Sequence, residues 1–226
     1  MNTSFSLPQF LSVLKDYNLS IWPLQVVAYL LGISAVFFAL KKTRFSNTLI
    51  TGILSFFWLW NGIVFCLIYW SPVYKMAIYF GVLFIIQGLL FLMTAIKYKL
   101  YFGFNRNIFS LVGIVFTVYA MVGYPFIGYF LDHIYPHSFP FGLVPCPLAI
   151  FTWGVFLLTD KKLPKFIAII PFIWSIAAVI PISRGIYEDY GLILSGVLGT
   201  VLVFIRDKQN KNVAVEDTSK QHNNDR

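Results

Sequence analysis

The chain has 226 residues, of which 58% are hydrophobic, 19% aromatic and only 12% charged, and its mean hydropathy is +0.76. Soluble domains carry about 25% charged residues, so this composition excludes a soluble fold, and two cysteines exclude a disulfide scaffold. The net charge of +8 comes from basic clusters between apolar runs, a pattern that indicates membrane orientation rather than a nucleic-acid partner. The composition therefore predicts an all-α integral membrane protein.

Residues 1–20 predict a short interfacial helix that lies on the membrane surface. Apolar side chains recur at helical spacing at Leu7, Phe10, Leu11, Leu14 and Tyr17. Ser6 is placed to cap this helix, and Pro8 suits its first turn. A secretory signal is not predicted, because no basic region precedes an apolar core and no small-residue cleavage site follows.

Seven apolar stretches are each expected to cross the roughly 30 Å of hydrocarbon in a bilayer. They cover residues 21–40, 47–70, 76–96, 107–131, 143–159, 164–183 and 189–205. Together they form a transmembrane domain over residues 21–205. The segment 206–226 is polar and without periodicity, so a disordered cytoplasmic tail is predicted there.

Basic residues follow every second span. The clusters are Lys41, Lys42 and Arg44; Lys97, Lys99 and Arg106; Lys161, Lys162 and Lys165; and Arg206, Lys208 and Lys211. The other side has only Lys15, Lys75 and Arg184. Because Lys and Arg are retained in the cytoplasm, this asymmetry predicts an N-terminus outside and a C-terminus inside. A miscount by one span would destroy the alternation.

Several short motifs are spread along the chain: Tyr17-Asn18, Ile21-Trp22-Pro23-Leu24-Gln25, Trp58-Leu59-Trp60 with Gly62, Pro145-Cys146-Pro147, Ile150-Phe151-Thr152 with Gly154, Glu188-Asp189 and Gly191-Leu192. With these motifs the chain resembles the domain-of-unknown-function 6064 family of bacterial membrane proteins. The resemblance implies a multi-pass protein of the bacterial cytoplasmic (inner) membrane and supplies no activity. Relatives often carry His where this chain has Cys66, so a shared role there must suit both side chains.

The first three spans and the last three carry similar short motifs in the same order. Pro23-Leu24 matches Pro147-Leu148, Leu59-Trp60-Asn61 matches Ile173-Trp174-Ser175, and Phe80-Gly81-Val82-Leu83 matches Tyr190-Gly191-Leu192-Ile193. One interpretation is a 3+1+3 parallel repeat, as in the sugar-transporting SWEET proteins. The alternative is chance alignment of apolar helices.

Ionisable residues are absent from the centre of every predicted span, which argues against proton relays and ion-coupled pumps. The sequence also lacks a zinc-helix motif, a nucleophile elbow and a phosphate-binding glycine loop. We therefore expect no enzyme and no cofactor.

Neutral polar residues occupy the middle of the spans and have two interpretations. They are Asn61, Gln87, Thr117, Thr152 and Ser175. Hydrogen bonds between helices are one explanation. The other is a site for a neutral polar solute, in which Trp60, Asn61, Gln87, Trp174 and Ser175 supply aromatic faces and hydrogen-bonding groups.

A second group of candidate residues lies at the predicted outer face. Cys66, His133, His137 and Cys146 are side chains that suit zinc or copper, with Asp132 beside them. The alternatives are buried small cysteines with a solvated loop, and a Cys66–Cys146 disulfide. Glu188 and Asp189 precede the last span, where the helix dipole favours acidic groups and Arg184 is near enough to pair with them; a cation-attracting role is the other interpretation.

The sequence favours a transporter or facilitator of a small neutral solute. The alternative is a membrane-embedded structural, assembly or sensory partner protein. The expected partners are the lipid bilayer and that solute, homo-oligomers are compatible with the sequence, and nucleic acid is excluded.

Overall fold

The computed structural model describes residues 6–97 and 100–224, with side chains described as far as residue 209. This part of the chain is helical and contains no strand. The elements are α1 (Leu7–Ser20), α2 (Leu24–Leu40), α3 (Ser46–Trp60), η1 (Asn61–Trp70), α4 (Ala77–Lys97), α5 (Ile108–Val118), η2 (Tyr119–Gly123), α6 (Tyr124–Phe130), α7 (Pro145–Leu157), α8 (Phe166–Ala177), α9 (Val179–Ile182), η3 (Tyr187–Asp189) and α10 (Tyr190–Asn224). The prediction of an all-α protein is confirmed.

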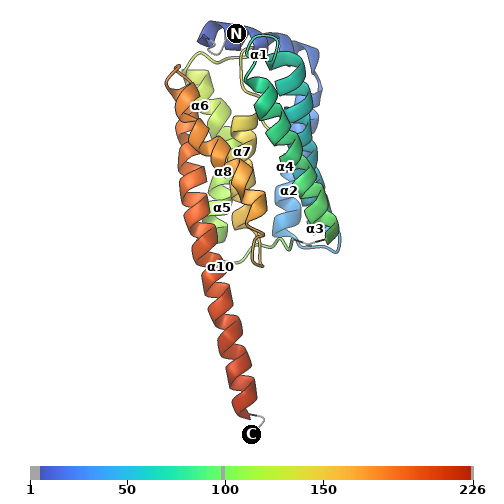
Figure 1. The fold of residues 1–226 in the computed structure, drawn as a ribbon, viewed down its shortest axis with the longest axis vertical. Coiled ribbons are helices and arrows are strands. Elements are labelled where there is room, and N and C mark those ends of the chain that lie inside the picture. The colour runs from blue at the N-terminus through green and yellow to red at the C-terminus, as the bar shows by residue number, and fades with distance from the viewer. Residues whose placement is uncertain (1–5, 98–99, 225–226) are drawn as a thin grey trace.

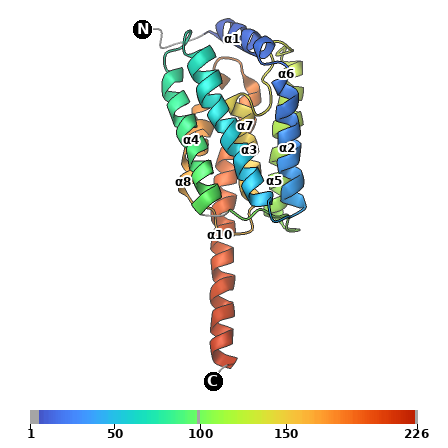
Figure 2. The same cartoon turned by 90° about the vertical axis from the view of Figure 1, so that its right-hand side faces the viewer.

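Helix α1 lies across one end of the bundle, which we call the α1 end (Figure 2). Ser6 caps it and Gln9 completes a capping box, and a proline occupies its first turn, as the sequence predicts. The axes of α1 and α2 meet at 87°, so the chain turns sharply before it runs along the bundle.

The following segments run alternately away from and toward the α1 end (Figure 1). Two of them contain π-helical stretches: η1 continues α3, and η2 joins α5 to α6. A π-helix in the middle of an α-helix often marks a functional region. Neither stretch is predicted from the sequence, because apolar periodicity cannot distinguish 3.6 from 4.4 residues per turn over so short a segment.

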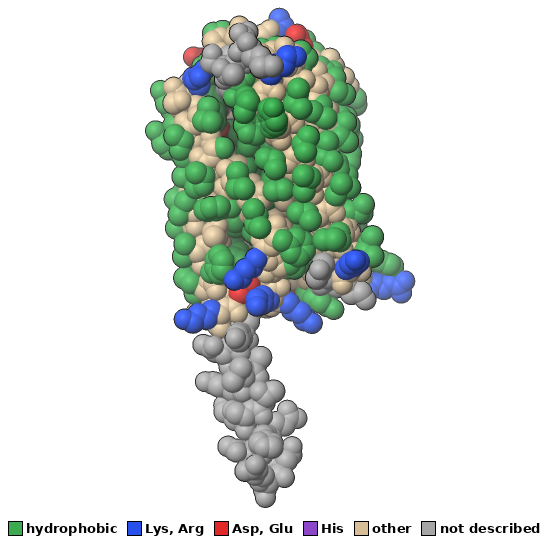
Figure 3. All heavy atoms as spheres, in the orientation of Figure 1, with side chains coloured by type: hydrophobic (Ala, Val, Ile, Leu, Met, Phe, Trp, Pro, Cys, Tyr) green, Lys and Arg blue, Asp and Glu red, His purple; other side chains and the backbone are tan. Residues whose placement is uncertain are grey.

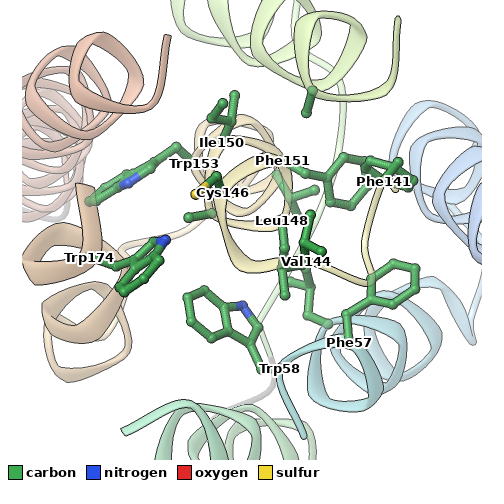
Figure 4. Packing of buried hydrophobic residues seen from close by; sticks show 14 of the residues in the cluster. Phe57, Trp58, Phe141, Val144, Cys146, Leu148, Ile150, Phe151, Trp153 and Trp174 are labelled. Atoms are coloured by element: carbon green, nitrogen blue, oxygen red, sulfur yellow. The ribbon is translucent and has the colours of Figure 1, made fainter. Parts of the chain in front are cut away.

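Helix α7 is the centre of the bundle. All of its residues are buried, and residues 139–159 form an unbroken buried segment. Helices α3, α5, α8 and α10 contact it from different sides (Figure 4). Because α7 meets protein instead of lipid along its length, its 13 residues are not required to match the thickness of the bilayer.

Glycines allow the helices around α7 to approach closely. A Cβ on Gly154 of α7 would lie 2.7 Å from the carbonyl oxygen of Gly113 of α5, and a Cβ on Gly113 would lie 2.8 Å from that of Gly154. Gly62 and Gly81 make a similar contact between η1 and α4. Close backbone contact at small residues replaces the hydrophobic effect as a source of helix association in lipid.

Four helical segments in the described part of the chain are long and apolar enough to cross a membrane. They are Ser46–Trp70, Ala77–Lys97, Ile108–Phe130 and Tyr187–Gln209. A fifth follows if α1 and α2 count as one broken span, while Pro145–Leu157 and Phe166–Ile182 are shorter apolar helices. Each of the seven predicted stretches thus contains helix, and four to five of them meet the length test.

The C-terminal boundary of the folded body differs from the predicted one. Arg206, at the start of the predicted disordered tail, is buried and donates to the Phe156 carbonyl oxygen at 2.6 Å. Its guanidinium also pairs with Asp207, whose carboxylate accepts from the Leu163 backbone N–H at 3.0 Å. The tail prediction is wrong at Arg206 and Asp207. These residues belong to the folded body because their charges neutralise each other and their side chains bond the Phe156 carbonyl and the Leu163 N–H. Helix α10 continues to Asn224.

The two halves of the proposed repeat have different environments. Helix α7 is buried on all sides, whereas its counterpart α2 exposes Leu30, Ile33 and Phe37 at 51–59%. The 3+1+3 repeat therefore stays a prediction.

Candidate functional site

The loop between α6 and α7, residues 131–144, folds into the α1 end and is held by side chains from distant helices. Tyr17 donates to the Leu143 carbonyl oxygen at 2.6 Å. Asn18 donates to the carbonyl oxygens of Pro136 and Ser138 at 2.6 and 2.7 Å. Buried loop carbonyls need such partners, because each unpaired one would cost free energy. The Tyr17-Asn18 motif thus fixes the α6–α7 loop against α1.

Two of the residues predicted to bind solute belong to the same anchoring contacts. Trp60 donates its indole N–H to the Tyr17 hydroxyl at 2.8 Å. Asn61 is fully buried and donates to the carbonyl oxygens of Phe57 and Gly142 at 2.9 and 2.8 Å. The structure therefore gives Trp60 and Asn61 a role in positioning the α6–α7 loop.

The other three residues of the predicted solute site lie apart from that loop. Gln87 is buried in α4 and donates to the Ile167 carbonyl oxygen at 2.9 Å. Ser175 accepts from the Trp153 indole at 3.1 Å and donates to the Pro171 carbonyl oxygen at 2.8 Å. The Gln87–Ile167 and Trp153–Ser175 contacts join different helices and match the interhelical interpretation, whereas the Ser175–Pro171 contact lies within α8. Of the five predicted residues, Trp174 lines a cavity.

That cavity, which we call the aromatic chamber, has a volume of about 40 Å³ and lies at the α1 end. Its walls come from α1, η1, α4, the α6–α7 loop, α7, α8 and α9. Seven of its fifteen lining residues are aromatic: Phe10, Phe65, Trp70, Tyr74, Phe80, Phe139 and Trp174. Cys146 and Asp189 supply its thiol and carboxyl groups. The volume compares with about 30 Å³ per water molecule in the liquid, so the chamber fits a very small solute.

Beside the chamber lies a cluster of buried ionisable side chains. Glu188 and Asp189 are both fully buried, and His133 is 5% exposed. His133 Nδ1 and Glu188 Oε1 are 2.5 Å apart. Asp189 accepts from the Tyr124 hydroxyl at 2.6 Å and from the Cys146 thiol at 3.3 Å. Burying carboxyl groups is costly unless they have such partners, and buried ionisable groups in membrane proteins commonly mark function.

The prediction for Glu188 and Asp189 is incomplete. The helix dipole and Arg184 were expected to stabilise these two carboxyl groups, and the structure shows in addition that both are fully buried. The main partner of Glu188 in this cluster is His133, which is 55 residues away in the sequence. A buried carboxylate needs a hydrogen-bond donor. The predicted outer loops contain few donors, and this scarcity was the only sequence signal that pointed to His133 as the partner of Glu188.

The predicted metal ligands are distributed over separate places. His133 points to Glu188, whereas His137 lines a surface hollow with Lys15 and Asp132. Cys66 and Cys146 are both free buried thiols. Within residues 6–97 and 100–224, no group of three or more His, Cys, Asp or Glu side chains could hold a metal ion. The structure therefore favours the interpretation in which the cysteines are small buried side chains.

Comparisons with known proteins leave the activity open and identify the family. No curated protein and no solved structure matches the chain. A family model described as a family of unknown function, DUF6064, matches residues 7–214. This match covers α1, the α6–α7 loop, the aromatic chamber and the acidic pair. The chain therefore belongs to the DUF6064 family of unknown function.

Proposed function

We propose that this protein is a facilitator that carries a small neutral solute across the bacterial cytoplasmic membrane, without catalysing a reaction. The observation that supports this is the aromatic chamber, which lies at one end of an apolar bundle and has a thiol and a carboxyl group in its lining. Binding sites for small molecules are commonly concave and mostly apolar with a few placed polar groups. The chamber replaces the predicted site around Trp60 and Asn61.

The α6–α7 loop and α1 form a cover over the chamber. Phe10 of α1 and Phe139 of the loop both line it, and their ring centroids are 6.0 Å apart. Since Tyr17 and Asn18 tie α1 to the loop, the two elements form one unit. Movement of this unit would open the chamber to the solvent at the α1 end, in the same way as lid movements admit ligands in other proteins.

We propose seven spans with the α1 end outside. The sides of the bundle are hydrophobic, and Lys and Arg side chains gather at the end opposite α1 (Figure 3). This distribution supports a cytoplasmic location for that end. Lys99 and the side chain of Lys211 lie outside the described residues. The two shorter helical segments, α7 and α8–α9, are compatible with spanning because neighbouring protein covers much of them.

A reporter fusion tests this orientation. An enzyme active only in the cytoplasm is expected to be active when fused after residue 210 and silent when inserted at residues 134–137. The physical reason is the asymmetry of basic residues between the two ends. Activity at both positions would require an even number of spans between them and would therefore exclude the seven-span arrangement.

Solute flux tests the transport proposal. Vesicles containing the purified full chain should swell faster than empty vesicles in gradients of small neutral solutes, measured by stopped-flow light scattering. Ala177 lines the chamber, so Ala177→Leu should fill it and return the rate to that of empty vesicles. Ala168→Leu is the matched control, because Ala168 lies on the same helix beside a different cavity. Equal rates for the protein and empty vesicles across the panel would refute transport.

A partner role is the second candidate, and one observation favours it. Helix α10 continues to Asn224 and projects far beyond the bundle (Figure 1). Such a projection offers a surface to another protein. Removing residues 211–226 should leave solute flux unchanged if transport is the function, whereas a partner role predicts loss of a co-purifying protein.

A further inference from the structure

One wall of the aromatic chamber carries a hydrogen-bond donor that is fixed in place. Trp174 is 8% exposed, and its indole N–H faces the Cys146 thiol, a weak acceptor, and has no oxygen or nitrogen acceptor among the residues that the structure describes. Edge-to-face contacts with Phe80 and Phe84, at centroid distances of 5.2 and 4.9 Å, hold the ring. Its nitrogen is on the side of the ring that faces Cys146 (Figure 4). A buried donor without a strong acceptor is costly, so a ligand with an oxygen acceptor would satisfy it.

A hydrogen-bond acceptor lies in the same chamber. Asp189 is fully buried, and its two carboxyl oxygens accept from Tyr124 and Cys146. A carboxylate has about four acceptor positions, so each oxygen has capacity for another donor. The Cys146 thiol is a weak donor at 3.3 Å, and a ligand N–H would compete with it readily.

Together these groups define the chemistry of the solute. We infer that the aromatic chamber binds a small neutral primary amide, of the class of formamide, acetamide and urea. The amide carbonyl accepts from the Trp174 N–H, an amide N–H donates to Asp189, and the planar group packs against the surrounding rings. This inference rests on the proposed transport function and specifies its substrate.

Two features distinguish an amide from other small solutes. A cation would suit the Asp189 carboxylate and the aromatic rings, but it would leave the Trp174 donor without an oxygen acceptor and place positive charge against it. An alcohol has a single oxygen that must serve both groups, whereas an amide separates its acceptor from its donor. The chamber of about 40 Å³ limits the solute to a few non-hydrogen atoms.

The small size of the solute also sets the affinity. A ligand of three or four non-hydrogen atoms is expected to bind with a Kd no lower than about tens to hundreds of micromolar. Weak binding of this kind is suited to rapid passage down a gradient, because a tightly held solute leaves slowly.

Flux in vesicles containing the full chain tests the inference. Formamide, acetamide and urea should each enter these vesicles faster than they enter empty vesicles. The ratio of the two rates should be larger for these amides than for glycerol or methylammonium. Trp174→Phe keeps the ring and removes the donor, so amide flux should fall about two- to tenfold. Trp58→Phe is the matched control, because it removes a buried indole bond to Thr152 outside the chamber and should leave amide flux unchanged.

Each outcome has a defined meaning. If glycerol or methylammonium enters rapidly and Ala177→Leu blocks it, while amides behave as in empty vesicles, the amide assignment is wrong and facilitated transport stands. If no solute enters faster than in empty vesicles, both proposals fail. Equal losses for Trp174→Phe and Trp58→Phe would refute the role of the Trp174 donor. Should Trp174→Phe fail to fold, the selective loss of amide flux in Ala177→Leu against Ala168→Leu provides the test.

Discussion

Replacement of Glu188 by leucine is expected to destabilise the protein by about 1–3 kcal/mol, since it leaves the buried His133 ring nitrogen without its hydrogen-bond partner. The free energy of unfolding in bicelles, obtained by steric trapping, measures this loss. The double variant His133→Leu/Glu188→Leu should recover much of it, because an apolar pair of similar size has no polar group to desolvate. The coupling between the two sites would then be read from the complete double-mutant cycle.

An exposed ion pair of the same chain provides the control. Lys42 and Asp160 are 2.7 Å apart, but the Lys42 side chain is 52% exposed. Lys42→Met should therefore cost less than about 1 kcal/mol. A loss for Glu188→Leu no larger than that for Lys42→Met would show that the His133–Glu188 contact contributes little to stability.

The second large effect is expected at the contact between α5 and α7. In Gly154→Ala, the new Cβ would lie 2.7 Å from the Gly113 carbonyl oxygen and 2.9 Å from the Thr117 backbone nitrogen. Backbone atoms cannot move aside as a flexible side chain can, so the helices must separate. Overpacking of this kind typically costs about 1–3 kcal/mol, and we expect the upper end of that range. The melting temperature in detergent should fall accordingly.

Gly52→Ala is the matched substitution without a clash. Gly52 lies in α3, and a Cβ there would meet no atom within 4 Å. Alanine favours a helix over glycine by about 0.5–1 kcal/mol, so Gly52→Ala should raise the melting temperature slightly. If both substitutions raise it, the close approach of α5 and α7 is not a source of stability.

The positions of the helices could be predicted because an apolar run is required wherever the chain crosses lipid. The capped helix α1 could be predicted for a similar reason, since Ser6 and the spacing of Phe10, Leu14 and Tyr17 are local signals. The central position of α7 could not be predicted from the sequence. Lipid and protein interiors are equally apolar, so hydropathy does not distinguish a helix inside the bundle from one facing lipid.

The candidate site was predicted less well, because its contacts join distant segments. The polar residues Asn61 and Ser175 have donors and acceptors that suit a solute, yet loop carbonyls and the Trp153 indole occupy them. The sequence does not show which partner such a group finds. Likewise, the partnership of His133 with Glu188 depends on how the α6–α7 loop folds inward. Trp174 lines a cavity, but this cavity differs from the expected one, which included Trp60 and Asn61.

The burial of α7 also bears on how the bundle is assembled. Of the helices synthesised before α7, α3 and α5 contact it, whereas α8 and α10 follow it in the sequence and cover its other sides. If the helices enter the bilayer in chain order, α7 first packs against α3 and α5 and stays exposed on the sides that α8 and α10 later cover. A chain ending at residue 131 would lack the element against which α3 and α5 pack. The first half of the protein is therefore expected to remain a loose set of helices, open to quality-control proteases, until α7 arrives and α10 closes the bundle around it.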